Sequence, residues 1–463
     1  MRAFLSKQRG QVVLMVAMSA LVLIGVVGLA IDTGVAYTIR EKLSSATDSA
    51  SLAAARAVSQ GDTQADQTAN AKAAAARFFA ANFPAGYLGA TATMNDPSVA
   101  FNNGLVTIDI SASAKMPISL MGVLNKTPLT PGVTSQTIRK ELDMVLVMDT
   151  SGSLSSSAAN VRSSAVTFLQ KFNNTTDRVG LLHFSYGSVV DTPIRTSGRG
   201  FDRATMTTQI NQYGFTGSTA SSEGMWQARA QLNSIPAANR SNLRVVVFFS
   251  DGAPNSVASY FPFNTAADCK TAGTMTTSDD TTVNWPGGLY DPNKVSTLLP
   301  TKCSPVAVIP PATPNRISNQ VSGMPLWYNA HNDASNPNDP TKQEFKLVTT
   351  SPRVVTADMS TETIAWQNVN RAARNMAEAL ASNLRDQNVF VFTLGLGTEL
   401  TQGTGPDKEA GRDVLKCMAN STDAPSRCYN PAKPVGLYCP AATVDDLTPC
   451  FSKLASAILR ISK

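Results

Sequence analysis

The chain has 463 residues, more than one ordinary hydrophobic core accommodates, so we expect two or three domains. Its hydrophobic content of 43% is that of a globular protein and excludes wholesale disorder. The 39 basic and 33 acidic residues leave a net charge of +6 with no dense basic run, so we expect no nucleic-acid partner.

The first predicted element is an apolar segment, Gly10–Ile31, that contains no charged residue. At a rise of about 1.5 Å per residue, a helix over this range spans a hydrocarbon core of about 30 Å. Arg2, Lys7 and Arg9 precede the segment and Asp32 follows it. The positive-inside rule therefore predicts a cytoplasmic amino terminus and an extracytoplasmic bulk. A cleaved signal peptide is the alternative, but its apolar region is shorter, at about 7–15 residues, so we favour an uncleaved single-pass anchor.

The next region, 32–140, combines helices with short strands. Small and apolar residues recur at helical spacing just after the membrane segment, which predicts that the first helix continues outward. These residues are Val35, Ile39, Leu43, Ala46 and Ala50. A second, alanine-rich helix is predicted at 65–83, and strands are predicted at 90–94, 104–114 and 132–141. The sequence therefore predicts a small α+β region.

The amino-terminal part resembles the TadE/TadG-like family of tight-adherence (Flp) pilus assembly proteins. The matching stretches are KQRGQ, the apolar span, GLAIDTGVAYTIREKLSSATDSASLAAA and VTIDISASAKMPISLMGVL, within roughly residues 5–140. The resemblance implies a single-pass protein of the bacterial inner membrane that acts with other pilus or secretion components and can reach the cell surface. Some related pseudopilins are cut after a glycine that has a glutamate five residues beyond. Here the residue at that distance from Gly10 is Met15, which argues against such processing.

After residue 140 the pattern changes to alternating strands and helices. Near-continuous apolar runs predict strands at 142–149, 178–185, 243–251 and 388–397. Helices are predicted at 157–172, 220–235, 363–384 and 443–462, and residues 189–196 are predicted as an antiparallel edge strand. Apolar runs of this kind are typical of strands buried on both faces. We therefore expect an α/β fold with a doubly wound, mostly parallel sheet.

A long insertion interrupts this α/β pattern at about 253–360. It is rich in Pro, Asn, Asp, Thr and Gly, which predicts loops with short strands. Its aromatic residues Trp285, Tyr290, Trp327 and Tyr328 are either exposed contact residues for a partner or the packing that holds the insertion on the domain. The predicted organisation is a cytoplasmic segment at 1–9, an anchor at 10–31, a helix-plus-strands region at 32–140 and an α/β domain at 141–463.

Two predicted strands end in aspartate, at Asp149 and Asp251. Ser151 and Ser153 follow the first aspartate, and Thr219 lies in a loop before a predicted helix. Because ligands of doubly wound sheets bind beyond the carboxyl ends of the strands, these side chains are the candidate site. Magnesium prefers oxygen ligands and usually keeps some of its waters, so the hydroxyls and carboxylates suit it.

These three motifs together resemble the metal-ion-dependent adhesion site of von Willebrand factor A domains. Asp149, Ser151 and Ser153 match the family's Asp-x-Ser-x-Ser, Thr219 matches its threonine, and Asp251 matches its final Asp-Gly. The resemblance implies that the hydroxyls bind Mg²⁺ (or Mn²⁺) directly and that the aspartates hold coordinated waters. An open position on the ion would then accept a carboxylate from a protein ligand.

The leading hypothesis is therefore a membrane-anchored pilus assembly or adhesion protein that is not an enzyme. A metal-dependent periplasmic hydrolase and a passive structural component of the pilus secretion machine are the alternatives. Ser151 lacks the Gly-x-Ser-x-Gly context of a hydrolase nucleophile. With two histidines in the chain, a histidine-rich zinc site is excluded, and His183 lies in an apolar run that predicts a buried strand.

The six cysteines all follow the membrane segment and form no Cys-x-x-Cys pair. They are Cys269, Cys303, Cys417, Cys428, Cys439 and Cys450. An even number beyond a membrane anchor suits disulfides in an oxidising compartment. The last four lie close together and favour local bridges, and the first two can pair with each other, but the connectivity stays open.

Overall fold

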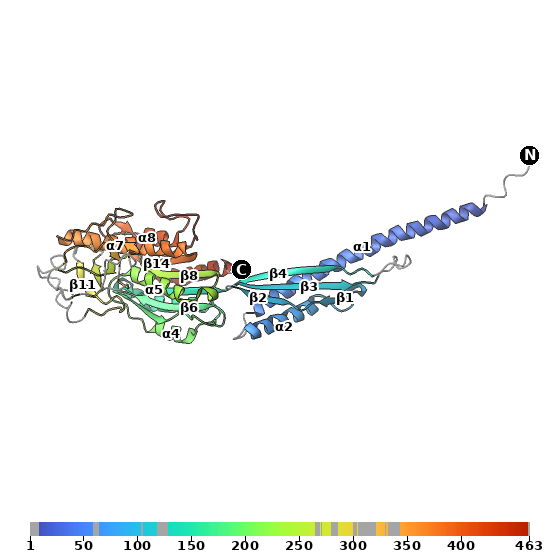
Figure 1. Ribbon diagram of the computed structural model, residues 1–463, viewed down its shortest axis with the longest axis horizontal. Helices are drawn as coiled ribbons and strands as arrows, with labels where there is room; N and C mark the ends of the chain where they lie inside the picture. The colour runs from blue at the N-terminus through green and yellow to red at the C-terminus, as the bar shows by residue number, and fades with distance from the viewer. Residues whose placement is uncertain are drawn as a thin grey trace, which may run out of the picture. The chain divides into compact units, whose positions relative to one another are not determined.

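The computed structural model describes residues 9–58, 64–102, 105–117, 128–263, 269, 271–278, 286–299, 303, 321–328, 330–331 and 343–461. The chain divides into two compact units, Met1–Arg139 and Lys140–Lys463 (Figure 1). Arg2, Lys7 and Trp285, which carry sequence predictions, lie outside the described residues. Each unit has its own hydrophobic core and is described by itself.

The first unit packs two helices on a four-stranded sheet. The helices are α1 (Arg9–Ala57) and α2 (Gln64–Asn82), with a short 3-10 turn η1 (Tyr87–Gly89). The strands are β1 (Thr91–Met94), β2 (Ser98–Asn102), β3 (Leu105–Lys115) and β4 (Gly132–Lys140). Strand β3 pairs with the other three strands. The predicted helices and strands of this region are all present.

The core of this unit lies between α1 and one face of β3. Alternate residues of β3 such as Ile108 and Ile110 are buried, because successive strand residues point to opposite faces. Ile39 and Leu43 of α1 are fully buried in the same cluster. Within the described residues, Val12–Ala57 is the one helix long and apolar enough to cross a membrane. The apolar side chains near the amino-terminal end of this helix are exposed, that of Val13 by 69%. The prediction of a long apolar amino-terminal helix is therefore confirmed.

The second unit is built on a six-stranded sheet in the order β17-β14-β8-β5-β6-β7. The strands are β5 (Leu142–Asp149), β6 (Arg178–Phe184), β7 (Ser188–Thr192), β8 (Leu243–Ser250), β14 (Val389–Leu396) and β17 (Tyr438–Ala441). Neighbouring strands are parallel except for the edge strand β7, which is antiparallel to β6. The predicted doubly wound, mostly parallel sheet is confirmed, as is the antiparallel edge strand.

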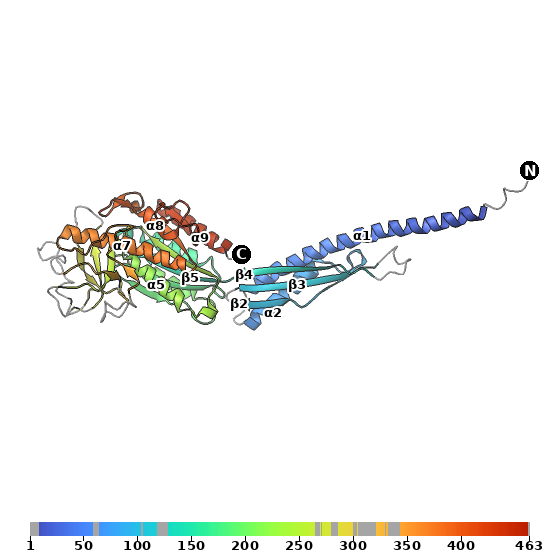
Figure 2. The same ribbon diagram turned by 45° about the horizontal axis from the view of Figure 1, so that its top comes forward.

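Helices cover both faces of this sheet (Figure 2). One face packs against α5 (Ser221–Ser234), α7 (Glu362–Asp386) and α8 (Gly411–Ala419). The other face packs against α3 (Ala158–Leu169), α4 (Arg203–Asn211) and α9 (Leu447–Ile461). In β5, Val145 and Val147 belong to the first core and Met144 and Leu146 to the second. Every residue of β5 is buried, which explains the apolar run from Met144 to Met148.

Short 3-10 turns and strands complete the unit. They are η3 (Gly152–Ser157), η4 (Ala237–Asn239), η8 (Thr398–Leu400), η9 (Val444–Asp446), β15 (Gly403–Thr404) and β16 (Glu409–Ala410). The insertion contributes the antiparallel strands β9 (Ser256–Ser259), β10 (Gly273–Thr277) and β11 (Pro286–Tyr290), and a pair β12 (Trp327–Tyr328) and β13 (Phe345–Lys346). The prediction of short strands in the insertion is confirmed.

The aromatic residues of the insertion pack it onto the domain. Tyr328 is buried and its hydroxyl donates to Oε1 of Glu223 at 2.8 Å. The rings of Tyr290 and Tyr186 stack with centroids 3.6 Å apart. Of the two hypotheses for these residues, exposed contact for a partner is therefore wrong for Tyr328, because its ring fills the core and its hydroxyl satisfies a buried carboxylate.

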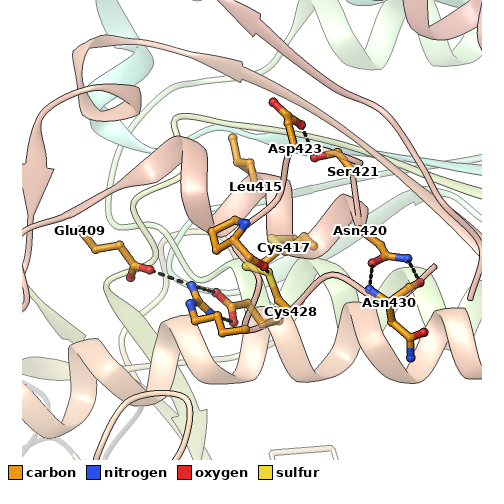
Figure 3. Close-up of a disulfide and its surroundings, with 12 residues drawn as sticks. Glu409, Leu415, Cys417, Asn420, Ser421, Asp423, Cys428 and Asn430 are labelled. Atoms are coloured by element: carbon orange, nitrogen blue, oxygen red, sulfur yellow. Dashed lines mark hydrogen bonds and ion pairs between the residues drawn. A yellow bond between two sulfur atoms is a disulfide. The ribbon is translucent and has the colours of Figure 1, made fainter. Parts of the chain in front are cut away.

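The six cysteines form three local disulfides, which leave no free thiol. The pairs are Cys269–Cys303, Cys417–Cys428 and Cys439–Cys450. The first closes part of the insertion, the second joins α8 to the loop that follows it (Figure 3), and the third joins β17 to α9. The prediction that His183 lies in a buried strand is also confirmed: it lies in β6 and is largely buried, with Nδ1 2.8 Å from Oδ2 of Asp191.

Candidate metal centre

Asp149 and Asp251 lie at the same edge of the six-stranded sheet. Asp149 is the last residue of β5, and Asp251 follows the last residue of β8. These two strands are parallel neighbours, so their carboxyl ends meet. Both aspartates are buried, with 0% and 1% of their surface exposed.

The carboxylate of Asp149 is held by the two turns that follow the strands. Its Oδ1 accepts the backbone N–H of Ser151 at 2.8 Å, and its Oδ2 accepts the hydroxyl of Ser250 at 2.6 Å. The hydroxyl oxygen of Ser250 also accepts the backbone N–H of Gly252 at 3.1 Å. Ser250 therefore joins the turn after β8 to the carboxylate at the end of β5, a role that the sequence motifs do not indicate.

A chain of hydroxyls connects the two carboxylates. The Oγ atoms of Ser151 and Ser153 are 3.2 Å apart, and the hydroxyl of Ser153 donates to Oδ2 of Asp251. The other oxygen of Asp251 accepts the backbone N–H of Ala253 at 3.1 Å. Four of the five predicted site residues thus meet in one hydrogen-bonded cluster.

The turn after Asp251 requires glycine. Gly252 has φ of 80°, which L side chains rarely adopt, and a Cβ there would lie 2.6 Å from the carbonyl oxygen of Gly411. A Cβ on Gly411, the first residue of α8, would in turn lie 2.7 Å from the carbonyl oxygen of Asp251. The start of α8 therefore packs directly on the turn that carries Asp251.

The loop before α5 brings Thr219 to this edge. The carbonyl of Gly217 accepts the backbone N–H of Gly152 at 3.0 Å, which fixes the loop beside the Ser151–Ser153 turn. The backbone N–H of Thr219 donates to Oδ1 of Asn255 at 2.8 Å, and the N–H of Asn255 donates to the carbonyl of Thr219 at 3.2 Å. Backbone contacts therefore place Thr219, which is 2% exposed, between the two aspartate turns.

Comparisons with known proteins agree with both resemblances. Residues 143–278 match the von Willebrand factor type A (vWA) domain family, and residues 10–57 match the Flp pilus-assembly TadE/G-like family. The chain joins a TadE/G-like segment to a vWA domain. No curated protein matches the chain.

Several solved structures match this chain with low TM-scores and low identity. The pilus adhesin SpaC from Lactobacillus rhamnosus GG matches with a TM-score of 0.37 and 14% identity over 80% of this chain and 34% of that chain. The vWF domain of the type V pili tip protein Mfa5 from Porphyromonas gingivalis matches with a TM-score of 0.38 and 13% identity over 71% of this chain and 98% of that chain. The PilB minor pilin from Streptococcus sanguinis matches with a TM-score of 0.37 and 14% identity over 81% and 79% of the two chains. The chain thus spans about a third of the length of SpaC.

The surroundings of Asp149 and Asp251 disfavour the charged form of both carboxylates. Burial raises the pKa of Asp149, and the charge of Asp251 raises it further. Burial also raises the pKa of Asp251 and outweighs the hydrogen bonds from Ser153 and Ala253. Within the described residues, no lysine, arginine or histidine forms an ion pair with either aspartate. Such a pair is costly unless a cation joins it.

A third acid, Glu399, lies beside this pair. It sits in η8, just after β14, and its charge contributes to the raised pKa of Asp251. A Cβ on Gly397 would lie 2.7 Å from Oε2 of Glu399 and 3.7 Å from Cβ of Asp251, so both acids border the space that this glycine leaves. The sequence motifs do not include Glu399. Its position just after an apolar strand, like those of Asp149 and Asp251, could have indicated that it lies at the same edge of the sheet.

The donor set fits a small, hard divalent cation. Among the described residues, no three His, Cys, Asp or Glu side chains gather to hold a metal by themselves. An ion at this edge would therefore need the hydroxyls of Ser151, Ser153 and Thr219 as well as the two carboxylates. Oxygen donors with few anionic ligands suit magnesium, which retains waters, better than they suit zinc, which prefers sulfur and nitrogen.

Proposed function

We propose that this protein is a membrane-anchored pilus assembly or adhesion protein whose vWA domain binds a protein ligand through Mg²⁺ (or Mn²⁺). The observation that carries the proposal is the buried pair Asp149 and Asp251, which lacks a cationic partner in the described part of the chain and is bridged by serine hydroxyls. The family match of residues 10–57 supports the pilus context.

The hydroxyl and carboxylate residues at this edge of the sheet would bind the ion in different ways. Ser151, Ser153 and Thr219 offer neutral hydroxyls as direct ligands, and Asp149 and Asp251 supply the negative charge and hold waters. When bound, the ion supplies a positive centre with an open position for a carboxylate of the partner. Ser250 and Asn255 keep the two turns and the Thr219 loop in place around it.

We propose that the amino terminus lies in the cytoplasm of a bacterium and that α1 crosses the inner membrane once. The rest of the chain would then be extracytoplasmic, within reach of other pilus or secretion components and of the cell surface. Three disulfides suit that oxidising compartment.

Binding without catalysis is the function that we favour for this site. Asp149 and Asp251 are buried and already accept two hydrogen bonds each, so neither is placed to take a proton from a substrate. A metal-dependent hydrolase remains the alternative because Glu399 is nearby. An ester and phosphate activity screen with and without magnesium separates the two, and magnesium-dependent turnover would favour the hydrolase.

Magnesium binding is tested by thermal unfolding of the full chain in detergent micelles. Free magnesium at 100 times its Kd should stabilise the folded chain by about 2.7 kcal/mol, because it binds the folded state alone. The Asp149→Ala variant should lose this stabilisation. The control is Asp386→Ala, which should keep it: Asp386 is exposed, and its Oδ1 lies 2.8 Å from Nζ of Lys433. Identical unfolding curves in magnesium and in EDTA would refute the metal site and leave a passive structural role.

A further inference from the structure

A second cluster of charged residues lines an open cleft of about 500 Å³ on the vWA domain. Its walls are formed by Pro352, Arg353, Val354, Arg371, Asp407, Glu409 and Arg427. These residues come from three separate segments: the end of the insertion, α7, and the region around α8. The volume lies in the range of ligand-binding clefts, roughly 300–1,000 Å³.

The centre of the cleft is an ion-pair network with more arginines than acids. Nη2 of Arg353 donates to Glu378 at 2.8 Å and to Glu409 at 2.7 Å. Arg427 donates to the same two carboxylates, at 2.5 Å and 2.9 Å. With Arg374, 3.6 Å from Glu409, and the pair Arg371–Asp407, the described part of the network holds four guanidinium groups and three carboxylates.

The excess of guanidinium groups makes the cleft electropositive. Burial alone would raise the pKa of Glu409, but the hydrogen bonds and charge of Arg353, with the charges of Arg374 and Arg427, lower it below its ordinary value. Hydrogen bonds from Arg371 likewise lower the pKa of Asp407. Both acids therefore stay ionised near neutral pH, and the lining of the cleft contains three arginines and two acids.

The arginines at the rim are accessible to a ligand. The side chains of Arg371 and Arg427 are 24% and 32% exposed, whereas that of Arg353 is 7% exposed. Val354, 50% exposed, and Pro352 add an apolar wall next to them. A guanidinium group matches the planar fork of a carboxylate, and the apolar wall suits the methylene groups that carry one.

The Cys417–Cys428 disulfide holds the rim in place. Cys428 directly follows Arg427, and its bond to Cys417 ties the loop to α8 (Figure 3). Asn420 strengthens the loop: its Nδ2 donates to the carbonyl of Asn430 and its Oδ1 accepts the N–H of Asn430, each at 2.7 Å (Figure 3). A guanidinium group held in this way loses little freedom on binding.

The cleft lies close to the candidate metal centre. Glu409, in its wall, precedes Gly411 by two residues, and two residues of extended chain span at most about 7 Å. Gly411 packs on Gly252, in the turn after Asp251. The two sites are therefore neighbours in the vWA domain.

We propose that this arginine cleft is a second binding site, which takes a carboxylate-bearing peptide segment of a protein partner. The cleft binds its ligand through Arg371 and Arg427 and needs no metal ion. The proposal rests on the proposed function in one respect, that the partner is a protein.

The test measures binding of a fluorescent hexaglutamate peptide to the full chain in detergent micelles, with EDTA present. Arg371→Gln and Arg427→Gln should each weaken binding at least tenfold, and Asp407→Asn should strengthen it about threefold because it removes a competing carboxylate. Misfolding cannot produce a gain. Arg412→Gln, which removes the same charge outside the cleft, is the matched control.

The outcomes of this binding experiment distinguish the arginine cleft from the metal site. Equal binding of a hexaglutamine peptide, or equal losses in Arg412→Gln and Arg427→Gln, would overturn the proposal. Peptide binding that appears only with magnesium and disappears in Asp149→Ala would assign the peptide to the metal centre and also overturn it. Peptide binding in EDTA by a chain that shows no magnesium effect would support the cleft while refuting the proposed metal site.

Discussion

The vWA domain buries carboxylates in two neighbouring regions and treats them in opposite ways. At the strand ends, Asp149 and Asp251 accept hydrogen bonds from hydroxyl and amide groups, and their pKa values are raised. In the arginine cleft, Glu409 is surrounded by guanidinium groups, and its pKa is lowered. Neutralising a buried acid should therefore stabilise the first region and destabilise the second. The absence of a cationic partner for Asp149 and Asp251 among the described residues is what supports the proposed metal site, whereas Glu409 belongs to an ion-pair network.

The largest effect is expected in the cleft. Glu409→Gln should lower the free energy of unfolding by about 3 kcal/mol, because it leaves Arg353, Arg374 and Arg427 with an unbalanced charge. Urea unfolding at pH 7 measures this loss. The control Glu344→Gln breaks a more exposed pair with Arg229 and should cost less than about 1 kcal/mol. Equal losses in the two variants would contradict the contrast.

We also expect Glu409→Gln to change how the stability of the chain depends on pH. Because the pKa of Glu409 is lower in the folded than in the unfolded chain, its contribution is complete above the unfolded value of about 4.3 and is lost as the pH falls through the folded value. Below about pH 4, the parent chain should therefore lose stability more steeply than Glu409→Gln. Parallel pH profiles would show that Glu409 does not carry the difference.

At the strand ends a smaller effect of opposite sign is expected. In EDTA at pH 8, Asp149→Asn should raise the free energy of unfolding by about 1–2 kcal/mol, because it removes a buried charge that Asp251 repels. Magnesium should then add no further stability. Chemical unfolding with and without magnesium checks both statements. A loss of stability in EDTA would mean that the hydrogen bonds of Asp149 outweigh the cost of its charge.

The smallest effect should come from the loop that carries Thr219. Asn255→Ala removes the acceptor of the Thr219 N–H and should cost about 1 kcal/mol and weaken magnesium binding several-fold. Ser256→Ala is the matched control. The hydroxyl of Ser256 donates to the same Oδ1 of Asn255, so this variant removes a hydrogen bond of Asn255 but leaves the one from the Thr219 N–H. Magnesium titration of both variants measures the difference, and equal affinities would remove Asn255 from the site.

The sheet could be predicted from the sequence because burial on both faces leaves a run of five apolar residues in each of β5 and β8, 144–148 and 245–249. Helices α4 and α8 were missed. In α4, Met206 and Ile210 are the buried residues, too few to show a period, and α8 is short and lies beside a disulfide. Strand β10 is buried but consists of Gly, Thr and Met, so nothing in its composition marks it as core.

The candidate site was predictable only where short motifs carry it. Asp149, Ser151 and Ser153 are neighbours in sequence, whereas Ser250 and Asn255 act through hydrogen bonds that exist once the strands are aligned. The arginine cleft was not predicted at all. Its charges come from residues between 353 and 427 that share no spacing, and packing of α7 against α8 and its loop brings them together.

The single residue Glu141 separates β4, which ends at Lys140, from β5, which ends at Asp149. If the proposed membrane anchor and ligand site are both correct, a pull between them would act lengthwise along β5. That strand lies inside the sheet with parallel partners β6 and β8 on its two sides. To draw β5 out, the force must shear both rows of hydrogen bonds at once, so the chain enters the domain at a strand that resists tension on both sides.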